Sequence, residues 1–231
     1  AHYPAEYMAA LLTSVGDAKD KLGIYLNECR RMGIRVLPPD VNASDVNFTA
    51  VGDDIRFGMA AVRNVGAQVV EQIKEARESQ GDFTSFHDFL EKVPLGVTNK
   101  RTIESLIKAG AFDSLGDTRR ALVDVHEQAI DEVISRKRNE AHGQVDLFAG
   151  LMDLEEAAPS VPERPEYARR DKLAFERDML GLYVSDHPLA GLELELAKLA
   201  TTGILDLIES ETAQDGDQVT IAGLITSVQH R

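Results

Sequence analysis

The 231-residue chain contains one cysteine, no tryptophan and no long apolar run. With Cys29 alone, an internal disulfide and a cysteine-based zinc site are excluded. No stretch approaches the roughly 18 consecutive apolar residues of a membrane span, so we expect no membrane contact and a cytoplasmic location. The start, Ala1-His2-Tyr3-Pro4, also lacks an initiator methionine and the basic and apolar segments of a signal peptide. The end lies in a strand-like run, and we therefore expect both termini to be internal to a longer protein.

Positive charge is scarce, and the formal net charge is −14 at pH 7. The imbalance is uneven, because residues 1–143 carry 18 basic and 22 acidic side chains whereas residues 144–217 carry 6 and 17. Between residues 92 and 120 the sign reverses, with six basic side chains against three acidic ones. Because nucleic-acid affinity depends on Lys and Arg that neutralise phosphates, this composition argues against tight autonomous DNA binding and leaves one small basic island.

Apolar residues recur at helical spacing over most of the chain, and Asp117 is the expected N-cap of the longest helix, which runs to about Arg138. Pro38-Pro39 excludes a helix at that point. Alternating apolar residues over 217–229 predict a half-buried strand. The expected fold class is therefore mainly α, with a short β element near residues 35–57 and one strand at the C-terminus.

A first helical hairpin is predicted around the pentapeptide Val62-Arg63-Asn64-Val65-Gly66, with a second helix starting at Ala67. Asn and Gly both tolerate positive φ, as a tight turn requires. Such a turn can aim the free N–H groups of the following helix at a phosphate, helped by the helix dipole. Because backbone donors contact phosphate rather than bases, Asn64, Val65 and Gly66 are candidates for non-specific DNA binding.

A second unit of similar layout has a helix over 100–108, a turn at Ala109-Gly110-Ala111-Phe112 and then the long helix. Thr98 or Asn99 is expected to cap the first of these helices. Glycine-linked helix pairs are common in all-α proteins, so a purely structural role is the alternative; two units close together favour DNA. The candidate DNA contacts of this unit are Lys100, Arg101, Lys108 and Gly110. Phe112 is expected to fill the core between the helices.

A third pattern, Gln144-Val145-Asp146-Leu147-Phe148, lies in a stretch rich in Gly, Pro and Glu that we expect to be an exposed loop. Leu147 and Phe148 would fill an apolar pocket of a partner, with about 2–4 kcal/mol of transfer free energy between them. Gln144 would orient the peptide through hydrogen bonds. Ordering the loop offsets part of this gain, so affinity on the order of micromolar is expected, which suits a tether used beside DNA contacts. The alternative is that both apolar side chains pin the loop to the helical core.

With these residues in hand, the whole chain resembles the alpha-subunit family of bacterial replicative DNA polymerase III. The most specific match is the segment Glu176–Leu189, and Asn64 stands where the family often has glycine. The other matching segments keep the family's order: Ala1–Tyr7, Glu28–Asn42, Gly58–Gly66, Asn99–Gly116, Gln144–Phe148 and Val219–Val228. The resemblance identifies Gln144, Asp146, Leu147 and Phe148 as a motif that binds the sliding clamp, the beta subunit.

The resemblance also implies a division into five segments. These are the C-terminal part of a fingers subdomain (1–50), a tandem helix-hairpin-helix region that binds duplex DNA (51–140), a clamp-binding loop and linker (141–165), a helical connector (166–216) and the first strand of an OB domain (217–231). The parent enzyme that the resemblance implies is a DNA-directed DNA polymerase, a nucleotidyltransferase, whose palm carboxylates would hold Mg²⁺. Those carboxylates lie outside this chain, so no catalytic residue, metal or cofactor is expected here. The implied partners are primer–template duplex, the sliding clamp and, through the parent chain, other replisome subunits.

Two other interpretations stay open: an error-prone paralogue of the alpha subunit, and a non-catalytic helix-hairpin-helix scaffold that binds DNA. The intact Gln-x-x-Leu-Phe pattern favours the replicative protein over the paralogue. Adjacent carboxylates such as Asp53-Asp54 are interpreted as solvated surface rather than as metal ligands.

Overall fold

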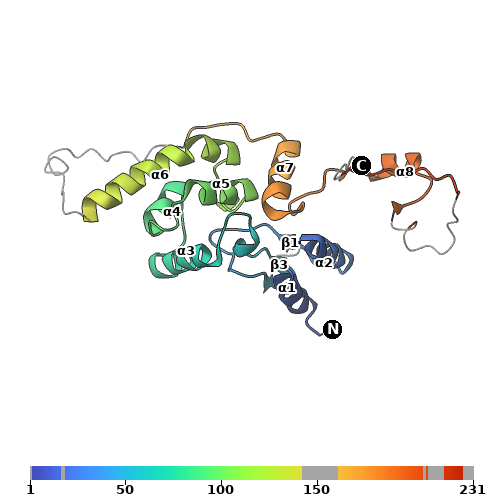
Figure 1. The fold of residues 1–231 in the computed structure, drawn as a ribbon, viewed down its shortest axis with the longest axis horizontal. Helices are drawn as coiled ribbons and strands as arrows, with labels where there is room; N and C mark the ends of the chain where they lie inside the picture. Colours follow the sequence, from blue (N-terminus) through green and yellow to red (C-terminus); the bar gives the residue numbers. More distant parts are fainter. Residues whose placement is uncertain (1, 17–18, 142–160, 205–206, 208–215, 226–231) are drawn as a thin grey trace. The chain divides into compact units, whose positions relative to one another are not determined.

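The computed structural model describes residues 2–16, 19–141, 161–204, 207 and 216–225. The chain divides into two compact units, residues 1–185 and 186–231. The first unit contains seven α-helices, a three-stranded sheet and two 3₁₀ turns among its described residues (Figure 1). No described helix combines the length and apolar character that crossing a membrane requires. The prediction of a mainly α fold with a short β element near residues 35–57 is confirmed.

Two helices and a small sheet begin the first unit. Helix α1 (Pro4–Ser14) starts with proline in its first turn, where the missing N–H costs nothing, and α2 (Lys19–Arg31) follows. The strands β1 (Val36–Leu37), β2 (Thr49–Val51) and β3 (Asp54–Arg56) form a sheet in the order β1-β3-β2. Strand β3 pairs parallel with β1 and antiparallel with β2, and α1 packs against β2 and β3.

The helices that follow enclose an aromatic core. They are η1 (Met59–Ala61), α3 (Ala67–Gln80), α4 (Phe86–Lys92), α5 (Lys100–Ala109), η2 (Asp113–Leu115) and α6 (Arg119–Ala141). Phe112 is 1% exposed, and its ring centroid lies 5.2 Å from that of Phe86 and 4.9 Å from that of Phe89, both edge-on. Burying each such side chain contributes about 1.5–3 kcal/mol, and the prediction that Phe112 fills this core is confirmed.

Helix α7 (Arg169–Leu180) completes the first unit by packing beside α5 (Figure 1). It buries the apolar Leu173 and Leu180 and also the charged Glu176. Helix α2 contacts the turn after α7 through Arg30, which donates a hydrogen bond to the Tyr183 carbonyl oxygen at 2.7 Å. Residues on both sides of the undescribed stretch 142–160 therefore belong to one compact unit. The division into five segments stays a prediction.

The second unit contains α8 (Glu193–Leu199). The predicted strand over 217–229 is wrong for its described part, since residues 217–225 form no strand and residues 226–231 lie outside the described chain. A strand needs a ladder of backbone partners. Thr220 of this stretch pairs with Thr201, a residue outside any strand: the Thr201 N–H donates to the Thr220 carbonyl at 2.8 Å, and the Thr220 N–H donates to the Thr201 hydroxyl at 2.9 Å.

Candidate nucleic-acid interface

The first hairpin joins η1 to α3 through the turn at residues 62–66. Asn64 has φ +63°, the only positive value among the described non-glycine residues. Gly66 has φ −85° and ψ 151°, so it is the extended N-cap of α3 and does not use the left-handed region. The Val65 N–H donates to the Val62 carbonyl at 3.1 Å and closes the turn. Asn64, and not Gly66, therefore supplies the left-handed residue that the turn requires.

Helix α5 holds this turn in place. The Asn64 side-chain amide donates to the Ser105 hydroxyl at 2.9 Å, and the Thr102 hydroxyl donates to the Asn64 carbonyl at 3.1 Å. Thr102 and Ser105 are both buried, and a hydrogen bond out of water is costly to lose. A glycine at position 64 could adopt the turn but could not make the amide contact. The two hairpins are thus tied together through the first turn and the N-terminal half of α5.

The N-terminus of α3 is open. Gly66, Ala67 and Gln68 are exposed, no side chain caps the helix, and their N–H groups have no acceptor among the described residues. By contrast, the Asn99 side chain accepts from the N–H groups of Arg101 and Thr102 at 3.0 and 3.3 Å, which confirms it as the cap of α5. Free N–H groups at a helix N-terminus favour an anion.

The cations of the two hairpins differ in how far carboxylates already neutralise them. Arg63 and Arg101 are exposed and make no ion pair within the described residues. Lys100 pairs with Asp131 at 2.7 Å, and this hydrogen bond raises the pKa of Lys100. Lys108 pairs with Glu104 at 2.6 Å and lies 5.3 Å from the centroid of the Phe175 ring. Of the predicted basic residues Lys100, Arg101 and Lys108, Arg101 is thus the one without an ion pair in the described chain. Arg63, within the first turn, is a candidate that the sequence reasoning missed.

The second hairpin runs from α5 through Gly110, η2 and Gly116 to α6. Gly110 is buried in the left-handed conformation at the end of α5, where a Cβ would come 2.2 Å from Nη2 of Arg119. It offers no exposed backbone to a phosphate, so its predicted place among the DNA contacts finds no support in this geometry. The N-cap of α6 is Thr118, whose hydroxyl accepts from the Ala121 N–H at 3.2 Å, and the prediction of Asp117 is wrong by one residue.

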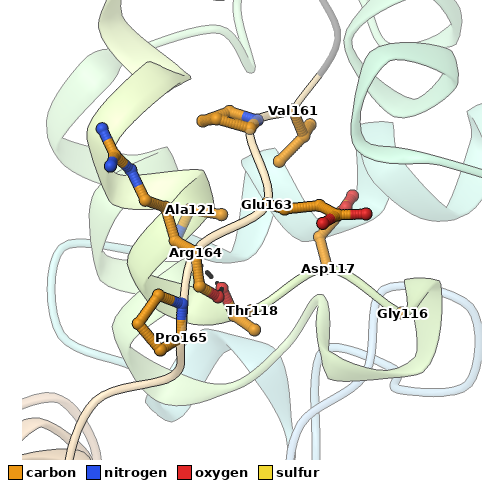
Figure 2. Close-up of a pocket in the computed structure, with 9 residues that line it drawn as sticks. Gly116, Asp117, Thr118, Ala121, Val161, Glu163, Arg164 and Pro165 are labelled. Carbon is orange, nitrogen blue, oxygen red and sulfur yellow. Dashed lines mark hydrogen bonds between the residues drawn. The ribbon is translucent and has the colours of Figure 1, made fainter.

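A carboxylate already occupies the N-terminus of α6. Glu166 accepts hydrogen bonds from the Arg119 and Arg120 N–H groups at 3.2 and 3.4 Å, and Lys172 lies 3.2 Å from the same carboxylate. The segment before Glu166 lies across this helix end, with the Thr118 hydroxyl donating to the Arg164 carbonyl at 3.1 Å (Figure 2). Between segment and helix is an open pocket of about 440 Å³ lined by Gly116, Asp117, Thr118, Ala121 and residues 161–165.

Comparison with known proteins accounts for this pair of hairpins. Residues 33–122 match the model of the helix-hairpin-helix motif. The full chain is 56% identical to DNA polymerase III subunit alpha of Saccharopolyspora erythraea and 50% identical to that of Mycobacterium tuberculosis H37Rv, and 99% of it is 40% identical to that of Thermus aquaticus. The chain belongs to the DNA polymerase III alpha-subunit family. It spans about a fifth of the length of these curated relatives.

Of two segments that carry the resemblance to the polymerase III family, one lies outside the described residues and the other within them. Gln144, Asp146, Leu147 and Phe148 fall outside the described residues. The segment Glu176–Leu189 is described, and its first residue is wholly buried. Glu176 accepts from Nη2 of Arg119 at 3.2 Å, from the Ser185 N–H at 3.1 Å and from the Ser185 hydroxyl at 2.7 Å. The structure therefore gives Glu176 a packing role that links α7 to the second hairpin.

Metal chemistry has no visible site in the described part of the chain, where no group of three or more His, Cys, Asp or Glu side chains is close enough to hold an ion. Asp53, one of the paired carboxylates in the turn between β2 and β3, is exposed, and Asp54 pairs with Arg35 at 2.5 Å.

Proposed function

We propose that this chain is the part of a replicative DNA polymerase alpha subunit that holds duplex DNA behind the primer terminus and tethers the enzyme to the sliding clamp. The observation that carries the DNA part is the open N-terminus of α3. Arg63 lies in the turn before this helix, and Arg101 is adjacent to Thr102, whose hydroxyl donates to the Asn64 carbonyl in the same turn. Family membership and the matched helix-hairpin-helix motif support the same assignment. DNA-directed synthesis with palm-bound Mg²⁺ is proposed for the longer protein, in the cytoplasm.

The contact should not depend on base sequence. Its donors are the N–H groups of Gly66, Ala67 and Gln68, which recognise an anion, and two guanidinium groups suited to phosphate oxygens. The excess of acidic residues in the chain limits the affinity of this contact alone. A second attachment through the clamp raises the effective concentration of DNA at the hairpin, so two weak contacts together can be tight.

The duplex contact is tested by the salt dependence of binding. We expect Arg63→Ala with Arg101→Ala to reduce the slope of log K against log salt concentration by about 0.9 for each phosphate lost. The matched pair Lys100→Ala with Lys108→Ala removes the same charge from side chains that carboxylates already neutralise, and should change the slope less. Equal slopes for the two double variants would remove the α3 end from consideration.

The clamp contact is tested separately by titration calorimetry against the cognate sliding clamp. Its support is the Gln144–Phe148 pattern together with family membership. We expect affinity on the order of micromolar, abolished in the Leu147→Ala, Phe148→Ala double variant with no fall in melting temperature. Lost binding together with a large fall in melting temperature would favour core packing by these two side chains instead.

The alternatives are separated by primer extension with the longer protein, in the presence and absence of the clamp. A scaffold gives no synthesis, and an error-prone paralogue gives synthesis with little clamp stimulation. The relatives from Saccharopolyspora erythraea and Mycobacterium tuberculosis are DNA polymerase III alpha subunits, which favours the replicative enzyme.

A further inference from the structure

The two hairpins present their second helices to solvent in different ways. At α3 the first N–H groups are exposed and find no acceptor in the described chain, whereas at α6 the corresponding groups of Arg119 and Arg120 already donate to Glu166. A carboxylate at this position satisfies the same donors, and the same positive end of the helix dipole, that a phosphate would satisfy.

From this difference we infer that Glu166 closes the second hairpin to DNA, acting as an internal substitute for a backbone phosphate. This inference rests on the proposed duplex binding, and it gives the two hairpins different roles in that binding. In the closed state only the first hairpin offers free backbone N–H groups to a phosphate.

The contacts around Glu166 stabilise this closed state. Besides the two N–H groups of α6, the carboxylate accepts from the Tyr167 N–H at 2.8 Å and pairs with Lys172. The Tyr167 ring packs edge-on against Phe175 with centroids 5.0 Å apart, and the Arg120 guanidinium lies 6.0 Å from the centroid of the Tyr167 ring. Removing the Glu166 side chain therefore removes the carboxylate while Tyr167 still anchors the segment.

The charges around the helix end decide what an opened site would bind. Without Glu166, Lys172 loses its partner and the exposed Arg120 faces the same end. Arg164 pairs with Asp124 at 3.3 Å and stays neutralised. Asp117 and Glu163 line the adjoining pocket and oppose an anion there (Figure 2). The two released N–H groups and the two cations attract a phosphate more strongly than these two carboxylates repel it. The reason is that they can form hydrogen bonds to the phosphate, and hydrogen bonds to a charged group are about twice as strong as those between neutral groups.

The test uses the 231-residue chain labelled with ¹⁵N and titrated with a short DNA duplex. In the unsubstituted chain the amide signals of Gly66, Ala67 and Gln68 should shift and those of Arg119 and Arg120 should not. In Glu166→Ala all five should shift, and the salt slope of binding should steepen by about 0.9, one phosphate's worth.

Glu163→Ala is the matched control, because it removes the same charge from the same segment but accepts no hydrogen bond from α6. Equal salt slopes for the two alanine variants would overturn the inference, as would a shift of Arg119 and Arg120 in the unsubstituted chain. If Glu166→Ala fails to fold, Glu166→Gln takes its place, since it keeps the side-chain volume and should give a smaller change in the same direction. Absence of any shift at residues 66–68 would instead refute the proposed duplex binding.

Discussion

Two constraints apply to Gly110: its backbone is left-handed, and it lies against the buried side chain of Arg119. Its φ of +85° disfavours any side chain, and an added Cβ would press on the guanidinium of Arg119, which is 2% exposed and held by hydrogen bonds. Gly116 has φ +96°, and nothing lies within 4 Å of the position that an added Cβ would take, so it carries the conformational constraint without the clash.

We therefore predict that Gly116→Ala lowers the free energy of unfolding by about 1–2 kcal/mol, the cost of left-handed backbone for an L-residue. Gly110→Ala should lower it by clearly more, because Arg119 must also move. Urea denaturation of both variants measures the difference. Equal losses would mean that Arg119 adapts freely.

Cys29 is a second residue whose environment sets its chemistry. It is wholly buried, and burial raises the pKa of its thiol to about 11. Because the thiolate is the reactive form, we predict that the folded chain resists alkylation by iodoacetamide at pH 8 and reacts fully after denaturation. Rapid alkylation of the folded chain, followed by mass spectrometry, would contradict this.

The basic island between residues 92 and 120 shows why charge counted along a sequence overstates a cationic surface. Lys92 pairs with Asp88 at 2.9 Å, Lys100 with Asp131 and Lys108 with Glu104. Arg119 is buried. Only Arg101 and Arg120 of the six basic side chains keep an exposed charge without a carboxylate partner in the described residues.

At the scale of elements, an ion pair ties helix α3 to the segment that precedes the sheet's second strand. Lys74 donates to Asp45 at 2.8 Å, and this hydrogen bond is the largest cause of the lowered pKa of Asp45. A carboxyl whose pKa is lower in the folded than in the unfolded chain adds stability at neutral pH. That contribution disappears as the pH falls from the ordinary pKa of the carboxyl, 3.8, through its lower pKa in the folded chain.

We predict that Asp45→Asn lowers the melting temperature at pH 7 and that the difference from the unsubstituted chain shrinks toward pH 3. Asp53→Asn, in an exposed turn, is the control and should leave the melting temperature nearly unchanged throughout. A pH-independent loss in Asp45→Asn would assign its role to packing rather than to charge.

At the scale of the whole first unit, a buried pair joins elements far apart in the chain. Arg119 at the start of α6 contacts Glu176 in the middle of α7, 57 residues later, and Glu176 also accepts from the turn that ends the unit. Removing one member of a buried pair leaves the other charge without its partner in a medium where that is costly.

Glu176→Ala should therefore lower the free energy of unfolding of the first unit by about 3 kcal/mol, at the lower end for such pairs because Asp113 still contacts Arg119. Asp178→Ala, on the exposed side of the same helix, is the matched control and should cost less than about 0.5 kcal/mol. Chemical denaturation of both variants gives the comparison. If both variants lost a similar free energy of unfolding, helix α7 would stabilise the unit through its apolar face alone.

The sequence by itself determined the features that depend on neighbouring residues. The helical class, the Asn99 cap, the turn at Asn64, the filling of the core by Phe112 and the polymerase III family all follow from local spacing or local motifs, and the structure or the comparisons confirm them. The clamp-binding pattern at residues 144–148 is also local, and it stays a prediction.

Only the tertiary structure decided which of the matching local features are available to a partner. The contact of Glu166 with α6 spans 47 residues, and that of Lys100 with Asp131 spans 31. Two hairpins of similar layout therefore differ: the N–H groups at the start of α3 are free in the described chain, and those of Arg119 and Arg120 already donate to Glu166. Hydrogen bonds and ion pairs act over a few ångströms in space, and sequence spacing does not show which distant carboxylate comes that close.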